Sequence, residues 1–213
     1  MNITTLSFVA ISLTCILVGG NATAGEFGPR HFGGLINDYS PSNVKGGPYE
    51  MHGQWSMDLH SEWGSVDTTA DFIADMTMAG YVTTLVTTPS DGTGTVAVQT
   101  QAGVGRHTHH ISLRNIAVTW NMSGCPNYLT NPSKGGFQIN GTVSILTGNG
   151  SNAPFETTPP SSTLQVCVTG GADITYSNVT LVFTGPATSH FGQQAIHGVV
   201  RVASAESDGN RQP

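Results

Sequence analysis

The sequence predicts an all-β fold, an antiparallel β-sandwich or a closed β-barrel of roughly nine strands. Three observations support this prediction. Apolar and polar residues alternate with period two over long stretches, and Gly, Pro, Asn and Ser separate those stretches. No segment of ten or more residues has the 3.6-residue periodicity and capping signals of a helix.

The clearest alternation begins at Tyr49 and predicts a β-hairpin. Odd-numbered residues are apolar up to Leu59, and even-numbered residues are apolar from Val66 to Met78. Paired residue numbers must therefore sum to an odd value, because a slip by one residue would turn the apolar set outward. A turn centred on Trp63-Gly64 predicts four cross-strand pairs: Trp55 with Phe72, Met51 with Met76, His52 with Asp75 and His60 with Asp67.

The remaining strands are expected between clear turn signals. The ranges are 81–88, 95–101, 106–113, 116–121, 136–146, 163–169, 174–183 and 195–202. Residues 25–48 are rich in Gly, Pro, Asn and Ser and are predicted to be an irregular lead-in. A single all-β domain is expected over residues 49–203, followed by a frayed polar tail over 204–213.

Residues 1–24 have the pattern of a cleavable signal peptide. They contain no charged side chain, include an apolar run from Leu6 to Val18 and end in Ala22-Thr23-Ala24, so the mature chain is expected to start at Gly25. The predicted localisation is secreted and extracellular, or periplasmic in a Gram-negative cell. No later apolar run is long enough for a transmembrane segment in the mature chain.

Signal removal would leave two cysteines, Cys125 and Cys167. Two cysteines in an exported chain predict one disulfide, and two buried free thiols are the alternative. The net charge is −6, only 9% of residues are charged, and no basic patch is present. Nucleic acid is therefore excluded as a partner, and an extracellular ligand or surface is expected instead.

The eight histidines offer the one chemical lead. In the segment 106–113, His107 and His109 share the parity of Ile111 and Leu113, so both are expected to point toward the interior, while His110 points outward. Two imidazoles at i and i+2 on a strand can ligate one zinc or copper ion if a neighbouring element adds a third. His197, His190 and His31 are the candidates for that place, and His197 is the working choice.

Two functions are compatible with these features. The first is a non-catalytic β-domain with a binding or structural role, since no nucleophile motif such as Gly-x-Ser-x-Gly and no cofactor motif is present. The alternative is a metal-binding protein or metal-dependent enzyme that uses His107, His109 and a third histidine. The alternative to metal binding is that His107 and His109 are partly buried polar residues, hydrogen-bonded to backbone or carboxylate groups.

Overall fold

The computed structural model describes most of the chain between Arg30 and Ser204. The described residues are 30–40, 44, 47–61, 63–87, 95–126, 135–148, 162–169 and 177–204, and for 81–87 and 95–104 only the backbone is described. The predicted signal peptide and the tail after Ser204 lie outside these residues. None of the helices in the described ranges has the length and apolar character needed to cross a membrane.

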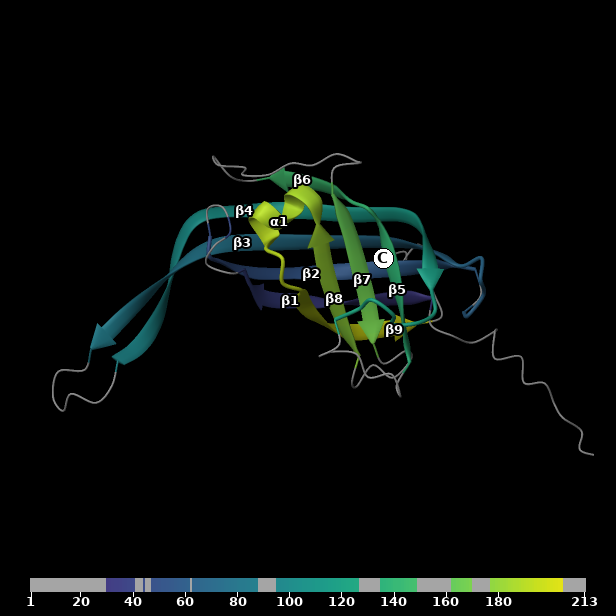
Figure 1. Cartoon of the computed structure of the whole chain (residues 1–213), viewed down its shortest axis with the longest axis horizontal. Helices are drawn as coiled ribbons and strands as arrows, with labels where there is room; N and C mark the ends of the chain where they lie inside the picture. The colour runs from purple at the N-terminus through teal and green to yellow at the C-terminus, as the bar shows by residue number, and fades with distance from the viewer. Residues whose placement is uncertain are drawn as a thin grey trace, which may run out of the picture.

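The described residues form strands with one short helical segment (Figure 1). The elements are β1 (His31–Tyr39), β2 (Tyr49–His60), β3 (Thr69–Thr87), β4 (Thr95–Thr119), β5 (Gly136–Thr142), β6 (Ser144–Gly148), β7 (Thr163–Thr169), β8 (Asn178–Thr184), a 3-10 turn (Gly185–Ala187), α1 (Thr188–Phe191) and β9 (Ile196–Ser204).

The sheet closes into a barrel, which decides between the two predicted all-β architectures. The strand order is β3-β2-β1-β9-β8-β7-β5-β4-β6, and β3 also pairs with β4. That last pairing closes eight antiparallel strands into a ring, while β6 lies outside the ring and pairs with β4. Closure removes the exposed edges that an open eight-stranded sheet would have.

The prediction of an irregular lead-in over residues 25–48 was wrong for residues 31–39, which form β1. Phe32 and Ile36 are buried, so the strand contributes to the core. Its alternation is interrupted at Gly33-Gly34, where the pairing with β9 shifts by one residue at a bulge. Glycines that mark a bulge resemble loop composition in the sequence, and this concealed the strand.

The predicted hairpin is present, but its register was wrong by two residues. Trp55 lies opposite Ala74, and His60 lies opposite Thr69, so paired numbers sum to a value two larger than predicted. The parity is as predicted, and the same faces are therefore buried. The cause is a longer connection between His60 and Thr69, in which the Thr68 hydroxyl donates to the Ser65 carbonyl at 2.8 Å.

The other predicted strands are present with altered ends. β7 matches its predicted range. The ranges 95–101 and 106–113 and most of 116–121 belong to the single long strand β4, and the range 136–146 is divided between β5 and β6. The outer parts of β3 and β4 pair with each other from Tyr81 to Thr87. Figure 1 shows this two-stranded ribbon continuing beyond the barrel.

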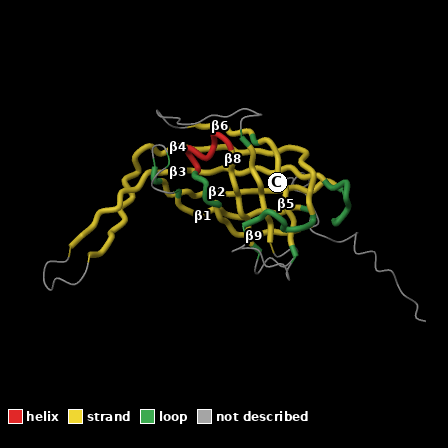
Figure 2. Tube along the Cα trace, in the orientation of Figure 1, coloured by secondary structure: helices red, strands yellow, loops and turns green. Residues whose placement is uncertain are grey.

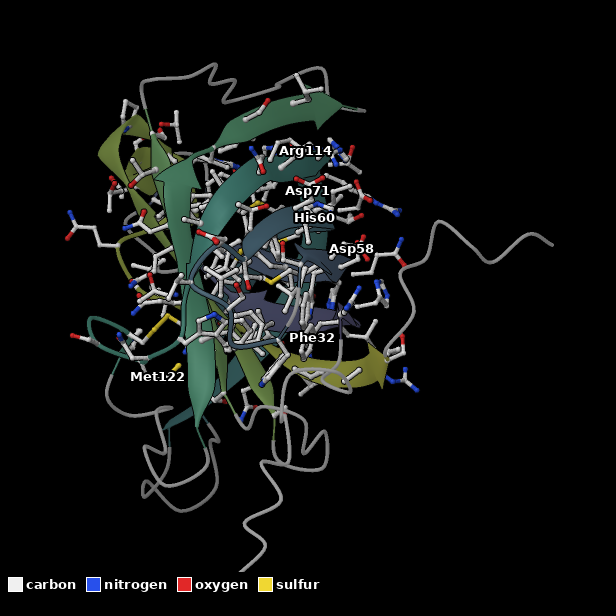
Figure 3. All side chains as sticks on the ribbon, turned by 90° about the vertical axis from the view of Figure 1, so that its right-hand side faces the viewer. Phe32, Asp58, His60, Asp71, Arg114 and Met122 are labelled. Atoms are coloured by element: carbon white, nitrogen blue, oxygen red, sulfur yellow. A yellow bond between two sulfur atoms is a disulfide. The ribbon has the colours of Figure 1, made fainter. Side chains whose placement is uncertain are left out.

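The two ends of the barrel are filled differently. At the end away from the ribbon, Phe32, Trp63, Trp120 and Phe137 pack together, with ring centroids of Trp63 and Trp120 4.6 Å apart. Figure 3 views the barrel from this end, with Phe32 labelled. The register places Tyr49, Gly80 and His107 at the opposite end. Aromatic side chains therefore fill one end of the barrel, and His107 lies at the other end, where the ribbon begins.

One disulfide joins Cys125, in the turn after β4, to Cys167 on β7, as predicted. The bond length is 2.10 Å, and both residues are buried. The alternative of two free thiols is therefore discarded. The bridge links two segments separated by 42 positions in the chain.

Replacing Gly34 with alanine is expected to destabilise the barrel by about 3 kcal/mol, at the upper end of overpacking costs. A Cβ at Gly34 would lie 1.8 Å from the Val199 carbonyl oxygen, which is backbone of the paired strand and has little freedom to move. Gly33→Ala is the matched control, because its Cβ would meet nothing closer than 3.4 Å. Urea denaturation of both variants checks this, and equal stabilities would contradict it.

Candidate metal centre

His107 and His109 enter the barrel from β4, on the face predicted from the sequence. Each is 1% exposed. His110 has the opposite parity, so its side chain lies outside the barrel and is 42% exposed. The two imidazoles lie at i and i+2, so the pleat alone brings their ring centroids to 4.8 Å. The strand therefore supplies two aligned nitrogen donors without any further adjustment of the backbone.

A third histidine, His190, reaches the same place from α1. Pro186 lies at the start of the preceding 3-10 turn, and Gly192, with φ of 92°, ends the helix. Proline near the first turn and glycine after the last are ordinary start and stop signals, and the helix between them is a single turn. Figure 2 shows this segment in red at the barrel end next to β4 and β8. His190 is 1% exposed.

The Nε2 atoms of these three histidines converge. His190 Nε2 lies 3.0 Å from His107 Nε2 and 3.0 Å from His109 Nε2. All three ligand atoms lie within 4.8 Å of one another. Two nitrogens bound tetrahedrally to zinc at ~2.05 Å would be ~3.3 Å apart, so the two 3.0 Å spacings from His190 Nε2 are close to those of a metal site. We call His107, His109 and His190 the histidine triad.

Two outer nitrogens of the triad, those of His107 and His109, lie beside neutral groups. His107 Nδ1 lies 2.5 Å from the Gly105 carbonyl oxygen, and His109 Nδ1 lies 3.0 Å from the Thr147 hydroxyl on β6. A carbonyl only accepts, so His107 Nδ1 carries the proton of this contact, and in the neutral imidazole the Nε2 atom presents a lone pair. Metal-binding histidines are oriented in this way by a partner on the second nitrogen.

With this protonation pattern, the triad has too few N–H groups to donate in both of its 3.0 Å nitrogen–nitrogen contacts. Because His107 Nε2 is an acceptor, its 3.0 Å contact requires a proton on His190 Nε2. That same proton would have to serve the contact to His109 Nε2 as well. A cation placed among the three nitrogens would satisfy all three lone pairs at once.

The surroundings of the triad are apolar. Tyr49 packs edge-on against His107 and His190 with centroids 5.2 Å from each, and Phe191 contacts His109. Burial, followed by the proximity of His190 and His107, lowers the pKa of His109 to about 3. Burial also raises the pKa of the Tyr49 phenol. His109 is consequently neutral near pH 7, which is the form that binds metals.

His197, the sequence-based choice for the third ligand, is not part of the triad. Its Nδ1 lies 2.9 Å from Asp38 Oδ2, and its backbone N–H donates to the same oxygen. The other candidate, His31, is bound to Asp58 at 2.9 Å. The structure places His197 away from the triad, because β9 carries it beside Asp38 of β1, whereas His190 of α1 lies against His107 and His109 of β4.

The remaining histidines all lie beside carboxylates. His52 contacts Glu50, His110 contacts Asp75 and His60 contacts Asp71, with nitrogen–oxygen distances of 2.6, 2.8 and 3.4 Å. The predicted pairs of His52 with Asp75 and His60 with Asp67 were therefore wrong, as the two-residue register shift requires.

Asp71 is the most extensively paired of these carboxylates. Partial burial alone would raise the pKa of Asp71, but hydrogen bonds from the Asn115 N–H and His60, together with Arg114, lower it. Figure 3 shows the labelled His60, Asp71 and Arg114 grouped on one side of the barrel. This group stabilises the strand pairing on the outer surface, where such pairs are usually weak.

A surface groove of about 650 Å³ runs along the outside of the barrel behind the triad. Its lining includes His109, Thr147 and Gly148, together with Asp75 and His110 on the outer face. The His109 side chain itself is almost wholly enclosed. The groove is therefore adjacent to the centre but separated from the converging nitrogens.

No family model matches this sequence, and comparison with curated proteins and with solved structures finds no significant match. Among the residues that the structure describes, the geometry of the histidine triad is the strongest indication of function.

Proposed function

We propose that this protein binds one transition-metal ion of the zinc or copper class through the Nε2 atoms of His107, His109 and His190. The observation that supports this proposal is the convergence of three buried imidazole nitrogens within 4.8 Å. Three side chains from β4 and α1 would rarely meet in this way only to fill a core, because each buried polar group costs free energy unless it is satisfied.

The ligand set selects the class of metal. Imidazole nitrogen suits zinc and copper, whereas calcium and magnesium require oxygen ligands. Within the described residues no Asp, Glu or Cys joins the cluster. The enclosed position of the triad and the disulfide favour a binding or structural role for the ion in an oxidising compartment outside the cytosol.

Elemental analysis of the purified protein, dialysed after loading with zinc or copper, tests the proposal. The wild-type chain is expected to retain about one ion per chain, and His109→Ala and His190→Ala to retain almost none, since a two-ligand site is incomplete. His197→Ala is the matched control and is expected to retain the wild-type amount. Circular dichroism of each variant separates ligand loss from unfolding.

Substoichiometric metal in the wild-type chain, or retention that neither triad variant reduces, would contradict the proposal. The triad would then be a set of mutually hydrogen-bonded core histidines.

A metal-dependent enzyme is the second candidate, and the groove beside His109 and Thr147 favours it. Catalysis would require an open coordination position that a substrate or water can reach. The protein loaded with copper(II) distinguishes the two functions: azide would change the visible spectrum of an open site and leave that of a closed site unchanged.

A further inference from the structure

We propose that the ion is copper(I) and that the Met78 thioether is its fourth ligand. This inference rests on the proposed function, because it assumes that the triad holds a metal. The inference adds the identity of the ion and a fourth ligand that completes its coordination shell.

The register of the barrel places two methionines, Met76 and Met78, opposite the two strand histidines of the triad. Met78 lies directly opposite His107 in the β3–β4 pair, and both residues are buried, with exposed fractions of 0% and 1%. Residues directly opposite on antiparallel strands share a face and have Cβ atoms ~5 Å apart. Met78 is unbranched and flexible enough to direct its sulfur toward a neighbouring imidazole.

A second methionine, Met76, lies opposite His109 but leans the other way. A Cβ added to Gly53 on β2 would lie 2.9 Å from Met76 Cγ, so the Met76 side chain covers Gly53. His109 lies on the opposite flank of β3, on β4. Met78 is therefore the thioether that we assign to the ion, and Met76 is its natural control.

The charge of the site favours a singly charged ion. The groups on the outer nitrogens, the Gly105 carbonyl and the Thr147 hydroxyl, are neutral, and no carboxylate in the described residues joins the cluster. The Born cost of burying an ion rises with the square of its charge. Without an anionic ligand, a divalent ion would remain an uncompensated double charge in an apolar interior, whereas copper(I) adds a single one.

Ligand softness points to the same ion. Thioethers are soft ligands that select copper(I), and imidazole binds copper in either oxidation state. Three imidazoles and one thioether would complete a four-coordinate shell with no position left for water. This arrangement agrees with the enclosure of the triad beneath Tyr49 and Phe191.

Competition titrations with copper(I) and bicinchoninate under anaerobic conditions, and parallel titrations with zinc, test the assignment on the full chain. We expect one copper(I) per wild-type chain. Met78→Leu should weaken copper(I) binding by about 10-fold or more, at least the scale of a supporting contact to a metal ligand. Zinc binding should change far less, and Met76→Leu should behave as wild type with both ions.

Copper K-edge absorption gives an independent readout. A sulfur neighbour is expected in the wild-type and Met76→Leu spectra and should be absent in Met78→Leu. If wild-type protein binds zinc more tightly than copper(I), or if Met78→Leu retains both the sulfur neighbour and wild-type copper(I) affinity, the assignment is overturned while the triad remains a metal site. If neither ion binds at all, the proposed function itself has failed.

Discussion

Replacing Cys125 and Cys167 together with alanine is expected to lower the free energy of unfolding by about 4 kcal/mol, the chain-entropy value for this loop length. The bridge closes a loop between positions 42 apart, and its removal gives the unfolded chain more conformations to lose on folding. It also frees the turn after β4 from β7. Urea denaturation of the double variant, compared with wild type, measures the effect.

Wild-type protein treated with a strong thiol reductant is the control, because it removes the bond and keeps both side chains. Its midpoint should move toward that of the double variant. A loss of less than about 1 kcal/mol in both samples would mean that the barrel closure already confines this loop, as compact unfolded states can do.

Acidification of the metal-free protein is expected to destabilise it steeply between pH 6.5 and about 3, because the pKa of His109 falls from 6.5 in the unfolded chain to about 3 in the barrel. Within this window the unfolded state binds a proton that the folded state excludes, so stability is full above the window and falls as the pH decreases. The slope from this one group is about 1.4 kcal/mol per pH unit.

The comparison with His109→Gln, both proteins treated with EDTA, isolates this contribution. At pH 8 His109 is neutral, so the two proteins differ only by the packing and the hydrogen bonds that the substitution changes. Between pH 6.5 and 5 the wild-type free energy of unfolding should decline more steeply than that of His109→Gln, as measured by urea denaturation at each pH. Parallel curves would show that His109 takes up its proton without unfolding.

The candidate site shows how far strand parity alone can reach. The i, i+2 spacing and the shared parity with Ile111 and Leu113 placed His107 and His109 inside, and the barrel has them there. Prediction of the third histidine of the triad required knowledge of which element covers the ribbon end of the barrel. α1 is a single turn, too short for a periodic pattern, and only Pro186 and Gly192 mark it in the sequence.

The register of the first hairpin illustrates the same limit. Parity excluded every register that would expose the core, so the buried faces were predicted correctly. It could not distinguish registers that differ by two residues, because both bury the same side chains. The longer connection between His60 and Thr69 decided between them. Within it the Thr68 hydroxyl donates to the Ser65 carbonyl, and the Val118 N–H on β4 donates to the Thr68 carbonyl.

The sequence by itself determined the all-β class, the face of each main strand and the identity of the only two cysteines left after the predicted cleavage. These properties depend on local alternation and composition, which each segment carries independently. Only the tertiary structure decided that the sheet closes as a barrel, that β1 belongs to it and that His190 rather than His197 meets His107 and His109. Those outcomes depend on contacts between segments far apart in the chain, and no local pattern encodes them.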